Sequence, residues 1–311
     1  MTPAHPITDS TGSAGPLAGD LASERRGLLL VALAATLWST GGLIVRSLES
    51  TDVWTTVLWR SIFAAGFLIV FIAVRDRGRT VQMFRTMGTP GLIVAACFAT
   101  ASISFVIALN LTSVANTLII LSTSPLLAAL LGRVILGERV RGRSWLAMIA
   151  AVIGVAIMVS DSIGQGSLIG DMMAFAIAVC LAVATVTIRR HRHVRMTPAT
   201  CLGAVLAAVI AAPWAQPLAV TGGDFGLLVV FGAFQFGAGL ALFSTGARLA
   251  PAAEVALILV LEPILGPIWV WVILDDHPGT AALIGGGIVL VALAAHTLLD
   301  RRKARAIPPA I

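Results

Sequence analysis

The sequence predicts an all-α integral membrane protein in which ten transmembrane helices form two inverted-topology repeats of five helices each. Three observations lead to this prediction: an apolar composition, basic residues gathered in alternate connections, and an internal repeat. Of the 311 residues, 58% are hydrophobic and only 12% are charged, and the mean hydropathy is +0.97. Soluble domains carry about 25% charged residues. The chain is therefore expected to lie in a bilayer.

Ten apolar stretches are long enough to cross a bilayer as helices, which takes roughly 17 to 25 residues each. The connections between them are too short to hold a soluble catalytic domain. Residues 1–27 are rich in Pro, Gly, Ser and Thr and are expected to form a disordered cytoplasmic tail, and 299–311 a basic tail. The expected spans are 28–45, 53–74, 89–109, 114–136, 144–160, 168–188, 198–219, 225–244, 252–274 and 280–298.

The charges of the connections alternate in sign along the chain. Arginines gather in every second connection; one such connection holds Arg75, Arg77 and Arg79. The connections between these basic ones carry acids such as Glu49 and Asp275. Because positive residues of short loops stay in the cytoplasm, both termini are predicted to lie there, in a multi-pass protein of the plasma or inner membrane. The net charge of +6 is thus explained by topology, and no nucleic-acid partner is expected.

Residues 115–136 and 253–274 repeat each other. A shift of 138 residues aligns ANTLIILSTSPLLAALLGRVIL with AEVALILVLEPILGPIWVWVIL, with eight of 22 positions identical. Pro125 aligns with Pro263, and both segments end in Val-Ile-Leu. These matches indicate a duplicated unit of five helices.

The predicted units are residues 28–160 and 161–298. Because five is an odd number, the second unit must enter the membrane upside down. The connections that follow the aligned helices, GERVRGR and DDHPGT, accordingly differ in charge. Inverted repeats are typical of secondary transporters, whose sites lie near the bilayer midplane between the halves.

Both units contain longer motifs. In the first these are ALAATLWSTGGLIVRSL, VLWRS and SPLLAALLGRVILGERVRGRSWLAMIAAVIGVAIM; in the second they are LIGDMMAFAIAVCLAVATVTIRR, EPILGPIWVWVIL and LIGGGIVLVAL. Together they resemble the drug/metabolite transporter superfamily, in its ten-helix EamA branch. The second unit departs from that pattern, with Leu274-Asp275-Asp276 where the family usually has Leu-Gly-Glu. The resemblance implies transport of amino acids, other metabolites or toxic compounds across the cytoplasmic membrane, in many members outward.

Glu262 is the acid that falls deepest in a predicted span. It lies ten residues into the ninth span, about 15 Å deep at 1.5 Å per residue, where an ionised carboxylate facing lipid is costly. Pro263 and Pro267 leave the carbonyls of Leu259 and Pro263 without helical partners, so a kink is predicted here. Two interpretations stay open: Glu262 donates to a freed carbonyl and stabilises the kink, or it lines a cavity and binds a cation or cycles a proton.

The fourth span offers the matching feature, because Ser124-Pro125 occupies the equivalent position in the first unit. Pro125 frees the carbonyl of Leu121, and Asn116 and Ser124 supply short hydrogen-bonding groups. Kinked, polar segments at corresponding places in two halves point to a transporter site, although such residues also mediate close helix packing. Asn116 and Ser124 are substrate-binding candidates, and Pro125 and the two prolines of the ninth span are gating candidates.

Arg60 is the other charge inside a predicted span. It lies about 10 Å deep, at seven residues from the outer end of the second span. A guanidinium binds a carboxylate in bidentate fashion, so Arg60 is a candidate partner for Glu262 or for a substrate carboxylate. The alternative is an arginine that reaches outward to the interface or bonds to backbone carbonyls.

Trp38, Ser39 and Gln235 complete the substrate-binding candidates. Trp38 and Ser39 lie deeper than the interfacial belt where tryptophans gather, and an indole there suits an apolar or cation–π wall as well as core packing. Gln235 lies in mid-span among glycines, which allow close backbone approach, so both cavity lining and packing remain open.

The sequence contains no pattern of catalytic or metal-ligating residues. Cys97, Cys180 and Cys201 match no metal or redox motif and are expected to pack as small apolar residues. No span carries a nucleophile with a base, so no cofactor and no metal are expected, and an intramembrane enzyme is the remote alternative.

The leading hypothesis is a secondary active transporter of a small organic metabolite, an amino acid or a similar amphipathic compound. It works by alternating access around a mid-membrane site, and export is the expected direction. Uptake or exchange of the same substrate class is the alternative. Membrane lipid is an expected partner, and proton coupling and a homodimer are left open.

Overall fold

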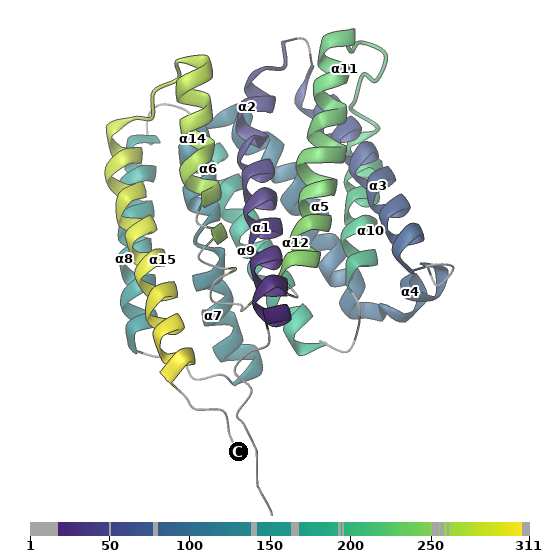
Figure 1. The fold of residues 1–311 in the computed structure, drawn as a ribbon. Coiled ribbons are helices and arrows are strands. Elements are labelled where there is room, and N and C mark those ends of the chain that lie inside the picture. The colour runs from purple at the N-terminus through teal and green to yellow at the C-terminus, as the bar shows by residue number, and fades with distance from the viewer. Residues whose placement is uncertain are drawn as a thin grey trace, which may run out of the picture.

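The computed structural model describes residues 18–49, 51–76, 80–137, 142–162, 168–191, 194, 196–247, 249–250, 255, 258–259 and 261–306. In this part of the chain six helical segments are long and apolar enough to cross a membrane, and four shorter apolar helices accompany them. The ten follow the order of the predicted spans (Figure 1), so the predicted all-α membrane fold is confirmed. Residues 1–17 of the predicted tail lie outside the described residues.

The first half of the chain contributes five spans, two of them interrupted. The first span consists of two helices with a break at Thr40, and the fourth of two helices with a break after Leu121. The helices are α1 (Ala18–Ser39) and α2 (Gly41–Arg46), α3 (Val53–Asp76), the short α4 (Thr80–Thr86), α5 (Gly88–Leu111), α6 (Val114–Leu121) and α7 (Ser124–Leu136), and α8 (Gly142–Ser162).

The second half repeats this order in the opposite direction through the membrane (Figure 1). Its third span contains a π-helical segment, η1 (Val230–Ala238), between two α-helices. The other helices are α9 (Leu168–Arg190), α10 (Thr197–Ala211), α11 (Gly222–Val229) and α12 (Gly239–Gly246) on either side of η1, α14 (Leu261–Leu274) and α15 (Thr280–Ala306).

Three boundaries differ from the sequence prediction. Residues 18–27 and 299–306, expected in the tails, are helical ends of α1 and α15, because acids near a helix start and bases near its end suit the helix dipole. The span expected at 198–219 ends at Ala211, since Pro213 has no N–H to continue the helix. The added helix α4 packs its Phe84 against the core beside α3.

The two halves are interleaved rather than set side by side. In the first half α5 packs against α9 and α10, and α3 against α10 and η1; α1 lies between α12 and α14, and α8 packs along α15. The approach of α8 to α15 is close enough that a Cβ on Gly154 would lie 2.6 Å from the carbonyl oxygen of Gly285. The core therefore forms between the units, and neither unit encloses it alone.

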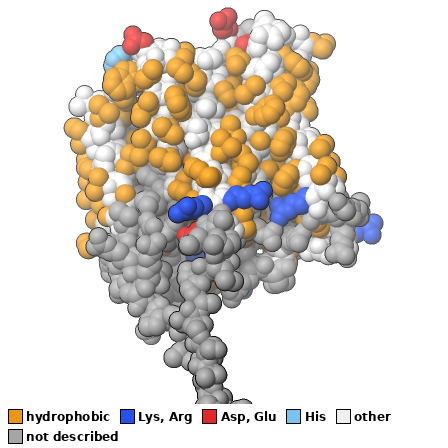
Figure 2. Space-filling model, viewed as in Figure 1, with side chains coloured by type: hydrophobic (Ala, Val, Ile, Leu, Met, Phe, Trp, Pro, Cys, Tyr) orange, Lys and Arg blue, Asp and Glu red, His pale blue; other side chains and the backbone are white. Residues whose placement is uncertain are grey.

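Charges separate to the two ends of the bundle. Figure 2 shows acidic side chains at one end, basic side chains toward the other, and an apolar surface between them. The acidic end carries the connections around α2, α11 and α14, and the basic end carries the starts or ends of α1, α3, α4 and α9. The described basic residues at that end include Arg25, Arg26, Arg75, Arg85, Arg189 and Arg190.

At the acidic end, hydrogen bonds join the two halves. Asp224 accepts from the backbone N–H of Glu49 at 3.3 Å and from the Thr51 hydroxyl at 2.9 Å. The backbone N–H of Gln216 donates to the Thr55 hydroxyl at 2.7 Å. We call these contacts the acidic-end clasp.

The start of α3 lies beside this clasp and is capped by Asp52. Its carboxylate accepts the backbone N–H groups of Trp54 and Thr55 and the Thr55 hydroxyl. Partial burial raises the pKa of Asp52, but the hydrogen bonds from Thr55 and Trp54 lower it by more, so this pKa lies below its ordinary value. The ionised cap satisfies N–H groups that a helix start leaves unpaired.

Candidate functional site

Helix interruptions place polar backbone groups inside the bundle. In the first span the break falls at Thr40, whose hydroxyl donates to the carbonyl of Leu37 at 2.7 Å, while the Ser39 hydroxyl donates to the carbonyl of Thr36 at 2.7 Å. Because lipid offers no hydrogen bonds, backbone carbonyls at a break must be satisfied within the protein. The side chains of the break residues supply those bonds.

The fourth span breaks next to Pro125. Leu126 and Leu127 both donate to the carbonyl of Thr123, and the hydroxyls of Ser122 and Thr123 donate to carbonyls one turn earlier, each at 2.7 Å. Pro125 has no N–H for the carbonyl of Leu121, as the sequence analysis expected. Ser124 is half-buried and begins α7 just after this break.

The ninth span behaves differently at its prolines. Pro263 lies in the first turn of α14, and the helix continues through Pro267 to Leu274 without interruption. Val260, immediately before α14, lies outside the described residues. Any kink at Pro263 therefore falls at the edge of the described chain.

The eighth span has a feature that the sequence analysis missed. Nine residues, Val230–Ala238, form a π-helix with Gln235 inside it. π-Helical turns are rare and are frequent at functional sites. The signal in the sequence was the spacing of the glycines around Gln235. In the structure, a Cβ on Gly232 would collide with the carbonyl oxygen of Arg60, and a Cβ on Gly239 with the indole nitrogen of Trp38.

Arg60 lies in an aromatic enclosure. Its side chain is 3% exposed, and its guanidinium carbon lies 4.6 Å from the ring centroids of Phe231 and Phe236 and 5.4 Å from that of Phe105. One nitrogen, Nη1, donates to the Ser102 hydroxyl at 2.6 Å. Arg60 therefore does not reach outward to the interface. Three helices, α3, α5 and η1, enclose this desolvated cation.

Gln235 connects this enclosure to the break in the first span. Its amide nitrogen donates to the carbonyl of Trp38 at 3.0 Å. A Cβ on Gly41 would lie 2.8 Å from that nitrogen and 3.2 Å from the Phe105 ring, so Gly41 permits all three elements to meet. We call the resulting group the central cluster; its members are Trp38, Gly41, Arg60, Ser102, Phe105, Phe231, Gln235 and Phe236.

Three polar atoms of the central cluster are buried without a hydrogen-bond partner in the described part of the chain. They are Nε of Arg60, Oε1 of Gln235 and Nε1 of Trp38. Buried polar groups are nearly always paired in proteins. Two donors and an acceptor left open in one cluster, beside a cation, suit a polar ligand with a negative group.

Arg60 makes no ion pair with Glu262 in this structure; within the described chain its hydrogen-bond partner is the Ser102 hydroxyl. Glu262 is half-buried on α14, one turn before Gly266, and so shares a helix face with it. A Cβ on Gly266 would lie 3.4 Å from the carbonyl oxygen of Ser39, and Trp269 donates to the Ser39 hydroxyl at 3.0 Å. The Glu262 face of α14 thus packs against the break that carries Trp38.

Asn116 lies elsewhere. Its amide donates to Asp171 at 3.3 Å and to the Thr112 hydroxyl at 3.5 Å, at the turn between α5 and α6. Thr112 also donates to Asp171, at 2.7 Å. The structure therefore gathers Trp38, Ser39, Arg60 and Gln235 around the first break, places Glu262 on the adjoining face, and separates Asn116 from them.

Comparison with known proteins decides the family. Residues 25–160 and residues 168–297 each match the profile of the EamA-like transporter family. The chain belongs to the EamA-like transporter family. Because this family consists of transporters, the protein is a multi-pass membrane transporter, and the alternative of an intramembrane enzyme is set aside.

Solved structures support the same fold. A crystal structure titled only "Crystal structure of protein" superposes with a TM-score of 0.64 at 22% sequence identity, covering 90% of this EamA-family chain and 99% of that chain. No curated relative matches the sequence at a significant level.

The hydrogen bond from Arg60 to Ser102 yields a test of the central cluster. Ser102→Ala removes the oxygen acceptor of a buried guanidinium and is expected to lower the stability of this EamA-family transporter by about 1–3 kcal/mol. Thermal unfolding of the purified protein measures the loss.

Ser61→Ala is the matched control, because the neighbouring Ser61 hydroxyl is buried and has no hydrogen-bond partner within the described ranges. Its removal should leave the unfolding temperature unchanged or slightly higher. Equal losses for both variants would mean that Ser102 contributes packing and not a bond to Arg60.

Proposed function

We propose that this transporter exports a small organic metabolite that contains a carboxylate. The proposed substrate is an amino acid or a similar amphipathic compound. The observation that carries the proposal is the buried Arg60 guanidinium, which has aromatic walls and one hydroxyl partner but no carboxylate partner among the described residues. A guanidinium fork matches a carboxylate in bidentate geometry. Trp38 and Gln235 offer an additional donor and acceptor beside it.

Glu262 supports the choice of an amphoteric substrate. It lies on the helix face that packs against the Trp38 break, so a positive group or a proton held there is near the central cluster. A substrate with both a carboxylate and an ammonium group then has one partner of each sign. Proton coupling through Glu262 is part of the proposal.

Contacts at the two ends of the bundle support alternating access as the proposed mechanism. The acidic-end clasp joins the halves on one side of the central cluster. On the other side α1 contacts α12, where a Cβ on Gly27 would lie 2.9 Å from the carbonyl oxygen of Gly246. Rocking of the two halves, residues 28–160 and 161–298, opens one set of contacts while the other stays closed.

Direction and orientation belong to the same proposal. Export is favoured because the resembling family carries many compounds outward; uptake or exchange of the same substrate class is the alternative. Faster loss of a preloaded labelled substrate from intact cells that make the protein would support export, and faster entry would support uptake.

The basic end of the bundle is proposed to face the cytoplasm of a cell with an inner or plasma membrane. A reporter enzyme that is active only in the cytoplasm, fused after residue 311, should therefore be active. The same reporter in the connection between α2 and α3 should be inactive. The opposite pattern would reverse the proposed orientation.

Arg60→Met tests the carboxylate partner. In proteoliposome counterflow with labelled amino acids and related metabolites, the variant should exchange carboxylate substrates at least about tenfold less, because bonds to a charged group are worth about 1.5–3 kcal/mol. Replacing a buried charge by an apolar side chain is often neutral or stabilising, so the variant should fold.

The control for this experiment is the decarboxylated amine of the same substrate, which wild type should not exchange. Unfolding temperature verifies that Arg60→Met is intact. Normal exchange by Arg60→Met would show that the aromatic enclosure serves the fold alone.

Glu262→Gln tests the coupling. The variant should retain counterflow, which needs no driving gradient, but should lose accumulation driven by a pH gradient when assayed at pH values of about 6 and 8, on either side of neutrality. Glu49→Gln, at the exposed acidic end, is the matched control and should behave as wild type. If Glu262→Gln concentrates substrate as well as wild type does, the glutamate only completes the turn at Pro263.

A further inference from the structure

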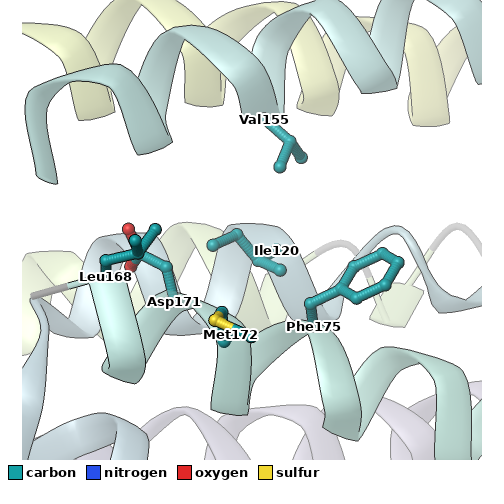
Figure 3. A pocket seen from close by; sticks show the side chains of 6 residues that line it. All are labelled: Ile120, Val155, Leu168, Asp171, Met172 and Phe175. Atoms are coloured by element: carbon teal, nitrogen blue, oxygen red, sulfur yellow. The ribbon is translucent and has the colours of Figure 1, made fainter. Parts of the chain in front are cut away.

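A second candidate site, a cavity with one buried carboxylate, lies at the side of the bundle, away from the central cluster. Figure 3 shows the side chains that line a cavity of about 190 Å³ between α8 and α9. Val155 comes from α8 and Ile120 from α6; the other lining residues, Leu168, Asp171, Met172 and Phe175, come from the first turns of α9. Apart from one carboxylate the lining is apolar.

The cavity has a buried floor and an open mouth. Ile120 and Asp171 are 1% and 2% exposed, whereas Met172 is 59% and Phe175 48% exposed. Exposed apolar side chains on a membrane protein face the acyl chains of the bilayer. The cavity is therefore a groove that opens sideways toward lipid, which we call the lateral groove.

Asp171 has one oxygen in use and one free. Oδ1 accepts the Thr112 hydroxyl at 2.7 Å and the Asn116 amide at 3.3 Å, which fastens α9 to the turn between α5 and α6. Oδ2 is buried and has no hydrogen-bond partner among the residues that the structure describes. Arg46, the nearby base, donates to the backbone carbonyl of Thr112 at 2.9 Å and makes no ion pair with Asp171 within the described chain. The floor of the lateral groove thus holds an unmatched acceptor.

The depth of Asp171 identifies what can reach it. It is the fourth residue of α9, and so about 5 Å from the start of that helix at 1.5 Å per residue. The polar headgroup regions add about 5–8 Å on each side of the hydrocarbon core, so headgroups and the helix start overlap in depth. A lipid beside α9 can therefore place its headgroup at Asp171 and its chain along Met172 and Phe175.

We propose that the lateral groove binds a membrane lipid with a primary ammonium headgroup, of the phosphatidylethanolamine type. The ammonium donates to Oδ2 of Asp171, and the upper part of an acyl chain lies between Val155 and Phe175. An ammonium has three N–H donors and forms short, charge-assisted bonds with a carboxylate. Size agrees as well, because an apolar cavity of about 150 Å³ already accommodates benzene.

The test uses the full-length protein in nanodiscs of phosphatidylglycerol with increasing fractions of phosphatidylethanolamine. The unfolding temperature of wild type should rise saturably with the ethanolamine lipid, and native mass spectrometry should show that lipid retained. Asp171→Asn keeps an oxygen for Thr112 and Asn116 but loses the charge. Its apparent affinity for the lipid should fall at least about tenfold, as expected for a lost bond to a charged acceptor.

A second pair of variants separates binding from folding. Val155→Phe fills the lateral groove without touching Asp171 and should also abolish the lipid-dependent rise. Val152→Phe lies on the same helix at a position that is 68% exposed, and it should behave as wild type.

Four outcomes overturn the proposal. The first is an equal unfolding temperature of wild type in both lipids, and the second is an Asp171→Asn variant that retains the full effect. The third is equal stabilisation by phosphatidylcholine, whose headgroup has no N–H to donate. The fourth is binding of a soluble alkylammonium without binding of the lipid, which would mean that the ligand of the lateral groove is a dissolved amphipathic cation. None of these readouts depends on transport, so they stand apart from the proposed substrate.

Discussion

The burial of one positive charge governs the middle of this transporter. Moving a guanidinium out of water costs several kcal/mol even after the protein relaxes. Around Arg60 the structure offsets that cost with three aromatic faces and one hydroxyl; a desolvated cation–π contact contributes about 2 kcal/mol. In the described part of the chain, this compensation includes no negatively charged side chain. Phe231 and Phe236 surround this group, and both belong to the π-helix.

The second constraint is the backbone. Each interruption in a bilayer leaves carbonyls that lipid cannot satisfy, and the chain answers with side chains from the interruption itself: Ser39 and Thr40 in the first span, Ser122 and Thr123 in the fourth. The Ser39 hydroxyl, which was a substrate-binding candidate in the sequence, therefore already donates to a backbone carbonyl. Trp38 and Gln235 keep unpaired atoms, which distinguishes them from the serines and threonines nearby.

Much of the fold was predictable from the sequence, because length, hydropathy and the alternation of charge are local properties. The break at Pro125 was predictable for the same reason, since a missing N–H is a property of one residue. The π-helix was not, because it depends on glycines meeting Arg60 and Trp38 from other helices. The polarity of Asn116 did not indicate its neighbours, because its partner Asp171 comes from the other half of the chain. Pairings between halves have no signature within either segment.

The nine-residue π-helix has a mechanical consequence. Its hydrogen bonds join residues five apart instead of four. The span therefore contains more residues than an α-helix of the same length in Å would need. Transferring those bonds by one residue would turn Gln235 by about 100°, the rotation per residue of an α-helix. Such a turn would detach Gln235 from the carbonyl of Trp38. The π-helix would thus allow the middle of this span to rotate about its axis, near the buried Arg60.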